Sequence, residues 1–223
     1  SSDTIDFTIT LDEDLGSGLT YSVSTSGTAT EGTDYETIPD VTISGTTGTF
    51  SITPTDDAIS DINETINLSL SASSSDSKLC STSLTSSTVT IVDNEAAPTI
   101  TLAASSSSIA ENAGSSITLT ATSSIISGSD ITVSFDTSST ATEGTDYGTI
   151  SDITISAGST TGTTTFTPTD DSMYETSTDE TAIIAIGTVS GGSATESGSQ
   201  SVTLTIEEND SAPSVTLAAS ASS

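Results

Sequence analysis

The stretch TATEGTDY occupies residues 28–35 and returns unchanged at residues 140–147. The sequence TPTDD follows each copy, at residues 53–57 and again at residues 167–171. Identity over eight consecutive residues, followed by a second match at nearly the same spacing, indicates an internal duplication with a period of about 114 residues. The fold is therefore expected to be that of one unit of this length, used repeatedly.

The phase of the duplication sets the expected domain boundaries. The stretch VTIVDNEAAPTITLAAS at residues 89–105 returns as LTIEENDSAPSVTLAAS at residues 204–220, and proline favours extended backbone just before it. We therefore expect a first repeat over residues 1–97, whose first strand lies upstream, and a second repeat over residues 98–212. Residues 213–223 then form the first strand of a following repeat, so the chain resembles a window cut from a tandem array.

Within each repeat the local hydrophobic period is two. Apolar residues alternate with Thr or Ser in residues 66–70, 88–92, 117–121, 131–135 and 202–206. This alternation is typical of strands with one buried and one solvated face, and no stretch shows helical periodicity. About seven short strands per repeat predict an all-β chain of tandem seven-stranded antiparallel β-sandwiches of immunoglobulin-like type. The short joints predict a rod-like array.

The charge balance excludes several classes of function. The 223 residues include 31 Asp and Glu, a single cation (Lys78) and no His, for a formal net charge of -30. Binding to nucleic acid needs a basic surface, and an anionic membrane surface would repel this chain. No apolar run is long enough to insert into a membrane. Without His there is no Ser-His-Asp nucleophile and no His-containing zinc site.

The composition also predicts a thin hydrophobic core. Hydrophobic residues make up 31% of the chain and aromatic residues 4%. Such a composition is also typical of a disordered, Ser/Thr-rich stalk carrying glycans. The regular alternation of apolar residues with Thr or Ser favours folded domains instead. An enzyme is not expected, because the same acids recur in both repeats and few aromatic residues are available to line a substrate cleft.

The acidic residues concentrate in loops and at strand ends. Converging carboxylates repel one another unless a cation lies between them. Calcium suits such a cluster because it takes six to eight oxygen ligands in loose geometry, whereas zinc and copper prefer nitrogen or sulfur. The sequence therefore favours calcium sites, and the alternative is a solvated acidic surface like that of proteins from saline habitats.

An ordered set of motifs, present almost twice over, resembles the Calx-β domain. In the first repeat the motifs are GTATEGTDY at residues 27–35, FSITPTDD at 50–57 and VTIVDNE at 89–95; in the second they are IAENAG at 109–114, TATEGTDY at 140–147, FTPTDD at 166–171 and LTIEEND at 204–210. The resemblance covers essentially the whole chain. It implies a seven-stranded β-sandwich that, in calcium-binding members, holds ions in loops at one end.

Carried over motif by motif, the resemblance implies two sets of calcium ligands. Those of the first repeat are Asp34, Asp56, Asp57, Asp61, Glu64, Asp93 and Glu95; those of the second are Glu111, Asp146, Asp170, Asp171, Glu175, Glu180, Glu208 and Asp210. The first repeat has no counterpart of Glu111, which would lie upstream of residue 1. The closing triple Asp of strong sites is here Asp93-Asn94-Glu95 and Glu208-Asn209-Asp210, which lowers the charge but keeps the oxygens.

The expected function is structural. We expect a calcium-binding segment of a secreted or cell-surface protein, forming a stiff rod such as an adhesin stalk or extracellular filament. Its partners would be neighbouring repeats, with head-to-tail self-assembly through the trailing strand and glycans on Ser and Thr as further possibilities. The alternative is an adhesion module that recognises a carbohydrate or protein receptor through its loops.

Overall fold

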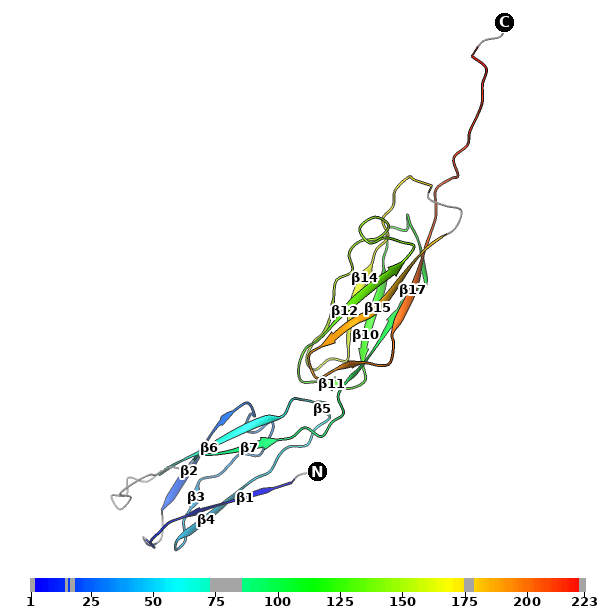
Figure 1. Cartoon of the computed structure of the whole chain (residues 1–223). Helices are drawn as coiled ribbons and strands as arrows, with labels where there is room; N and C mark the ends of the chain where they lie inside the picture. Colours follow the sequence, from blue (N-terminus) through cyan, green and yellow to red (C-terminus); the bar gives the residue numbers. More distant parts are fainter. Residues whose placement is uncertain (1–2, 15, 17–18, 73–85, 175–178, 221–223) are drawn as a thin grey trace. The chain divides into compact units, whose positions relative to one another are not determined.

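The computed structural model divides the chain into two compact units, which are described separately. Residues 3–14, 16, 19–72, 86–174 and 179–220 are the described part (Figure 1). Unit 1 comprises Ser1–Ala58 and Ile62–Asn94, and unit 2 comprises Ile59–Asp61 and Glu95–Ser223. The described residues form strands, turns and bends without any helix, which confirms the prediction of an all-β chain with two tandem β-domains. The exact boundary between residues 97 and 98 stays a prediction.

Unit 1 contains two antiparallel sheets. Its strands are β1 (Ile5–Thr10), β2 (Thr20–Gly27), β3 (Val41–Thr42), β4 (Thr47–Ile52), β6 (Glu64–Ala72) and β7 (Ser87–Ile91). One sheet pairs β1 with β4, and the other has the order β3-β2-β6-β7. The strand interiors 66–70 and 88–91 alternate as the sequence predicts, because Thr and Ser face solvent where Ile66, Leu68 and Val89 face the core.

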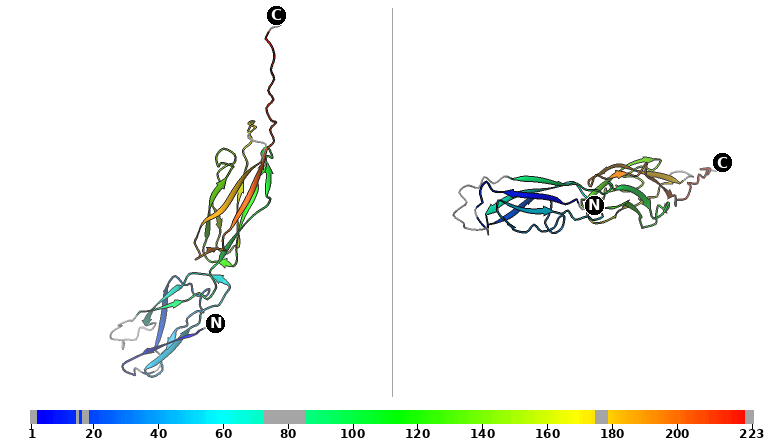
Figure 2. Two further views of the ribbon diagram at one scale, coloured as in Figure 1. Left: turned by 45° about the vertical axis from the view of Figure 1, so that its right-hand side comes forward. Right: turned by 90° about the horizontal axis from the view of Figure 1, so that it is seen from below.

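Unit 2 repeats this plan with more of its strands described. They are β8 (Thr99–Ala104), β9 (Ser108–Ala110), β10 (Ile117–Ser123), β11 (Ile126–Ser127), β12 (Ile131–Ser139), β13 (Ile153–Ile155), β14 (Thr161–Phe166), β15 (Glu180–Ser190), β16 (Thr195–Glu196) and β17 (Ser201–Glu207). The sheets have the orders β14-β10-β8-β16 and β13-β12-β15-β17-β9. The strands β12, β15 and β17 run side by side in every view (Figures 1 and 2).

Most strand pairs in unit 2 are antiparallel, as predicted, and short parallel pairs add to them. The strand β16 pairs in parallel with β8, and β9 pairs in parallel with β17. A further short strand, β5 (Ile59–Ser60), belongs to this unit and pairs in parallel with β11. The parallel pairing of β9 with β17 matters most, because it places the residues after these two strands next to each other.

The core of each unit consists of aliphatic side chains packed around a few aromatic ones. In unit 2 the rings of Tyr147 and Phe166 pack with centroids 4.8 Å apart, and both side chains are fully buried. In unit 1 the rings of Phe7 and Phe50 stack at 4.9 Å. Tyr35, the counterpart of Tyr147, is also fully buried, so both tyrosines are packing residues.

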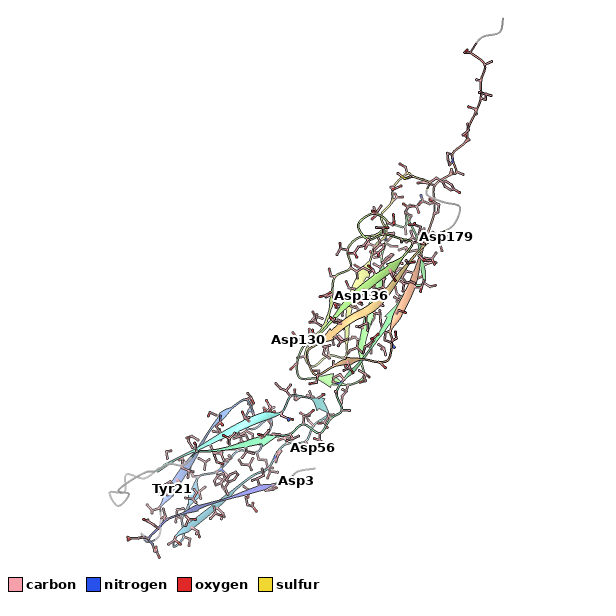
Figure 3. All side chains as sticks on the ribbon, viewed as in Figure 1. Asp3, Tyr21, Asp56, Asp130, Asp136 and Asp179 are labelled. Atoms are coloured by element: carbon pink, nitrogen blue, oxygen red, sulfur yellow. The ribbon has the colours of Figure 1, made fainter. Side chains whose placement is uncertain are left out.

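Strand direction in unit 2 gathers the acidic loops at one end. The antiparallel register pairs Ser139, at the end of β12, with Ala182, and it pairs Glu180, at the start of β15, with Ile206 near the end of β17. Asp179, directly before β15, lies at this end, whereas Asp130, before β12, lies at the other (Figure 3). The TATEGTDY loop follows β12 and therefore starts at the same end as Asp179.

Gly27 closes β2 at a position where a side chain does not fit. Its φ is +131°, and a Cβ added there would lie 2.1 Å from the carbonyl oxygen of Thr65. We expect Gly27→Ala to lower the free energy of unfolding of unit 1 by about 3 kcal/mol, from backbone strain together with displacement of that strand. Urea unfolding measures the loss. Gly45→Ala is the control, because φ is +67° there but nothing lies within 4 Å. Equal losses at both glycines would contradict the steric explanation.

Candidate metal centre

Three carboxylates meet at the acidic end of unit 2. One oxygen from each of Glu111, Glu208 and Asp210 lies within 4.8 Å of the other two. Glu111 is buried, and Glu208 and Asp210 are half-buried. Within the described ranges, this is the one group of three or more acidic, His or Cys side chains that are close enough to share a metal ion.

The parallel pairing of β9 with β17 is what brings these residues together. Its register aligns Ala110 with Glu207, so that Glu111 and Glu208 follow as neighbours at the ends of the two strands. The backbone N–H of Glu111 donates to the carbonyl of Glu207 at 3.1 Å, which extends the ladder into the site. Asp210 lies two residues further on, where the chain has left the sheet.

Backbone N–H groups donate hydrogen bonds to two of the three side chains, Glu111 and Glu208. One oxygen of the third, Asp210, accepts no hydrogen bond from the described residues. An Oε1 of Glu111 accepts from the backbone N–H of Asp171 at 3.1 Å, and Oε1 of Glu208 accepts from the N–H of Asp210 at 2.6 Å. The Oδ2 atom of Asp210 is shielded from solvent and accepts no hydrogen bond from the described residues. A shielded carboxylate oxygen without a donor is costly, and a cation at this point would satisfy it.

The electrostatics of the site favour binding of positive charge. Burial raises the pKa of the Glu111 carboxyl; the charges of Glu208, Asp171 and Asp210 raise it further, against a lowering by the hydrogen bond from Asp171. Loss of solvent also raises the pKa of Asp210, and the charges of Glu208, Asp171 and Asp170 add to this. No arginine or histidine exists in the chain to neutralise the cluster.

The arrangement fits calcium. Calcium binds carboxylate oxygens at about 2.3–2.6 Å, so two oxygens on one ion are separated by about 5 Å at most. The 4.8 Å limit on the three oxygens meets this condition. Glu111, Glu208 and Asp210 would thus hold the ion, with Asp170 and Asp171 close enough to act on their charge. The set contains only oxygen donors, which suits calcium better than zinc or copper.

The side chains of Asp146 and its counterpart Asp34 each accept a hydrogen bond from within their own TATEGTDY loop. An Oδ2 of Asp146 accepts from the N–H of Thr142 at 2.6 Å, and Asp34 accepts from Thr30 at the same distance. The Asp146 carbonyl in turn accepts from the N–H of Thr169 at 3.0 Å, which ties the TATEGTDY loop to the TPTDD segment. These two aspartates therefore stabilise their own loops. Neither belongs to the group of three clustered carboxylates.

The remaining predicted ligands of unit 2 lie around this cluster. Asp170 and Asp171 follow β14, and Glu180 opens β15 beside Ile206 of β17. The N–H of Met173 donates to Asp171 at 2.6 Å, which forms a turn directly after the TPTDD segment. Glu175 lies outside the described residues. The structure thus brings three of the predicted ligands into one group, and the wider ligand set stays a prediction.

The predicted ligands of the first repeat occupy matching places in the chain but form no such group in the described residues. Glu64 opens β6 as Glu180 opens β15, and Asp93 follows β7, where its N–H donates to Oδ1 of Asn63 at 3.2 Å. Asp61, in the segment Ile59–Asp61, and Glu95 both belong to unit 2. Asp56 and Asp57 complete the set, which remains a prediction.

The raised pKa values predict an unusual pH dependence for the metal-free protein. A carboxyl whose pKa is higher in the folded than in the unfolded chain stabilises the fold below its ordinary pKa, and this contribution is lost as the pH rises through the raised value. In chelator, we therefore expect the free energy of unfolding of unit 2 to increase as the pH falls from 7 towards 4.5, the ordinary value for Glu111.

Urea unfolding in chelator across this pH range measures the effect. Glu111→Gln combined with Asp210→Asn removes both titrating groups, so the slope should become flatter in that variant. An unchanged slope would show that other carboxylates of this acidic chain carry the dependence.

Comparison with known proteins identifies the fold family. The family model described as the Calx-beta domain matches residues 1–95 and 93–210. No curated protein sequence matches the chain. A crystal structure of the apo-form Calx CBD1 domain is 18% identical, covers 50% of this chain and 99% of its own, and superposes with a TM-score of 0.41.

Two further solved structures show the same range of similarity. The calcium binding domain CBD12 of CALX1.1 is 17% identical over 83% of this chain and 74% of its own, with a TM-score of 0.34. The Yersinia pseudotuberculosis adhesin InvE is 13% identical over 93% of this chain and 55% of its own, with a TM-score of 0.42. Because the family model extends over nearly the whole sequence, the chain belongs to the Calx-beta domain family, with two copies of the domain in tandem.

Proposed function

We propose that this chain is a structural calcium-binding segment of a secreted or cell-surface protein. Calcium would bind the acidic end of unit 2 and hold its loops together, and the matching motifs of unit 1 would act likewise. In this role the segment serves as part of an adhesin stalk or extracellular filament, with neighbouring repeats as its partners.

One observation carries the proposal. Glu111, Glu208 and Asp210 present three oxygens within 4.8 Å, and a shielded oxygen of Asp210 accepts no hydrogen bond from the described residues. Such a group is unfavourable without a cation and favourable with one. The free energy of ion binding adds directly to the stability of the folded state.

Two features support a structural rather than a catalytic role. The chain has no histidine, and the TATEGTDY and TPTDD motifs occur in both repeats, which suits an ion needed by every domain. No described helix has the length and apolar character needed to cross a membrane.

The tandem organisation supports the role as a stalk or filament. The last strand of the first repeat ends at Ile91 and the first strand of the next begins at Thr99, with Pro98 just before it. A short linker that contains proline is what the proposed stalk or filament would need between its repeats. The many exposed Ser and Thr side chains on the strands offer attachment points for O-linked glycans.

Replacing one carboxylate tests the site. We expect Asp210→Asn to weaken calcium binding by unit 2 by about 10- to 100-fold, because it removes a charged ligand while keeping the shape of the side chain. Isothermal titration calorimetry of the whole chain measures this as the loss or weakening of one binding step. Asp152→Asn is the matched control, since this exposed aspartate precedes β13 and lies outside the cluster. Equal calcium affinities in the two variants would exclude Asp210 as a ligand.

A further inference from the structure

Unit 2 includes a strand that comes from outside its own repeat. The strand β5 (Ile59–Ser60) lies between β4 and β6 in the chain, and both of these belong to unit 1. Residues Ile59–Asp61 nevertheless cluster with unit 2. The rest of unit 2 begins at Glu95, so the unit is assembled from two separate pieces of the chain.

Backbone pairing holds this strand on unit 2. The strand β5 runs parallel to β11, with Ile59 opposite Ile126 and Ser60 opposite Ser127 (Figure 1). The N–H of Gly128 donates to the carbonyl of Ser60 at 3.1 Å, which continues the pairing beyond the end of β11. Among the described residues β11 has no other strand partner, so β5 is the neighbour that satisfies its edge.

The two paired serines are enclosed by the unit. Ser60 is 3% exposed and Ser127 is 2% exposed, although serine is usually found at the surface. Ser127 is also fixed from its other side, because its Oγ accepts from the N–H of Ser129 at 3.1 Å and its carbonyl accepts from the N–H of Gly158 at 2.9 Å. Burial to this degree indicates that the segment is packed into the unit rather than laid on its surface.

Gly128 leaves the space that the end of the segment needs. A Cβ added at this residue would lie 2.6 Å from Cγ of Asp61, much closer than two nonbonded carbon atoms approach. The carboxylate of Asp61 therefore lies directly against the backbone of Gly128. The chain at the end of β11 thus combines a strand edge with a glycine against which an acidic side chain fits.

We propose that residues 59–61 form a docking strand on which the stability of unit 2 depends. The receptor is the edge of β11 together with Gly128, and the ligand is the extended tripeptide Ile-Ser-Asp of this same chain. Backbone pairing provides the affinity, while the enclosed Ser60 and the fit of Asp61 against Gly128 provide the specificity, as in strand addition generally. The second domain is accordingly incomplete within its own repeat.

Tethering explains how so short a strand remains docked. Two paired residues would bind weakly as a free peptide, because a few hydrogen bonds return less free energy than association costs. Residues 59–61, however, are joined to the chain at both ends, by Ala58 and Ile62, so the pairing is intramolecular and its effective concentration is about millimolar. By linkage, docking of the strand and folding of unit 2 stabilise each other.

A disulfide tests whether the strand is docked. Ser60→Cys with Ser127→Cys places thiols on opposite residues of neighbouring strands, which are about 4.8 Å apart and so within the Cα separation of about 4.4–6.8 Å that disulfides accept. In a chain that also carries Cys80→Ser, mild oxidation in chelator should cross-link most of the protein. Ser60→Cys with Thr163→Cys is the control, since Thr163 pairs with Thr120 in a different sheet. Equal yields from the two pairs would overturn the docking.

Ser60→Glu should detach the strand, because an enclosed site cannot hold a charge without a partner. We expect the Gly128 amide to exchange at least about tenfold faster, and the urea midpoint of the β12 and β15 amides to fall by about 0.5–1 M. Ile62→Glu is the matched control, since it adds the same charge at a side chain that is 59% exposed and should change neither quantity. Equal effects of the two variants, or none from either, would overturn the proposal.

A second set of substitutions tests the fit at Gly128. Gly128→Ala should lower the urea midpoint of unit 2, because its methyl group meets the Asp61 carboxylate, whereas Gly148→Ala should not, since the nearest atom there is 3.9 Å away. Adding Asp61→Ala to Gly128→Ala should recover at least about half of the loss. Absence of any recovery would overturn the placement of Asp61 at Gly128. All of these measurements are made in chelator, so their failure and the failure of calcium binding are separate results.

Discussion

Removing calcium should lower the melting temperature of unit 2 by about 10–20 °C. At millimolar-range sites typical of extracellular domains, about 10 mM calcium corresponds to 10–100 times the dissociation constant and contributes up to about 2.7 kcal/mol. For a domain of this size each kcal/mol shifts the midpoint by about 4–8 °C. The clustered carboxylates also repel one another once the ion is gone, which adds to the loss.

Differential scanning calorimetry of the chain in calcium and then in chelator measures this shift. Added calcium should restore the transition. Magnesium should restore it poorly, because it demands regular octahedral geometry and gives up its water reluctantly. Asp152→Asn should behave like the original protein, and Asp210→Asn should show a much smaller difference between the two conditions. Superimposable transitions with and without calcium would refute a structural ion in unit 2.

Truncating Phe166 should cost about 3–5 kcal/mol of the free energy of unfolding of unit 2. The ring is fully buried, pairs across the sheet from Ile117 and packs against Tyr147 at 4.8 Å. Since aromatic residues form only 4% of the chain, few neighbours can move in to fill the cavity left by Phe166→Ala. Urea unfolding should show a midpoint lower by about 2–3 M.

Two further substitutions set the scale for this loss. Met173→Ala, at a side chain that is 66% exposed, should change the stability by less than about 0.5 kcal/mol. Phe50→Ala in unit 1 should cost roughly half as much as Phe166→Ala, because its stacking partner Phe7 is half exposed and part of the site is already open to water. A loss at Phe50 as large as that at Phe166 would contradict this effect of burial.

The fold could be predicted from the sequence because its signals are local. Alternation of Thr with Ile, Val and Leu marked β10, β12 and β17, and the repeated TATEGTDY and TPTDD motifs marked the two domains. The parallel pairing of β9 with β17 could not be anticipated in the same way, since β9 is only three residues long and its partner lies at the far end of the repeat. In so short a strand, the alternation of apolar and polar residues is too brief to indicate which strand it pairs with.

The sequence predicted the type of the candidate site but not which carboxylates come together in it. Acidic loops and the family resemblance pointed to carboxylates at one end of each sandwich, and the group of Glu111, Glu208 and Asp210 agrees with that expectation. Which carboxylates converge depends on strand register and on hydrogen bonds from backbone N–H groups. Asp146 illustrates this, because its Oδ2 accepts from Thr142 within its own loop. No sequence spacing distinguishes such a carboxylate from one that faces an ion.

The pairing of β9 with β17 also constrains how unit 2 reaches its native state. Glu111 and Glu208 come from opposite ends of the repeat, so the ion site exists only after the most sequence-distant strands have met. Contacts of such high contact order form late and make folding slow. An ion bound there could not guide the early collapse of the chain, and it would act instead by slowing the unfolding of the folded domain. The lifetime of such a domain would then depend on its unfolding rate as much as on its equilibrium stability.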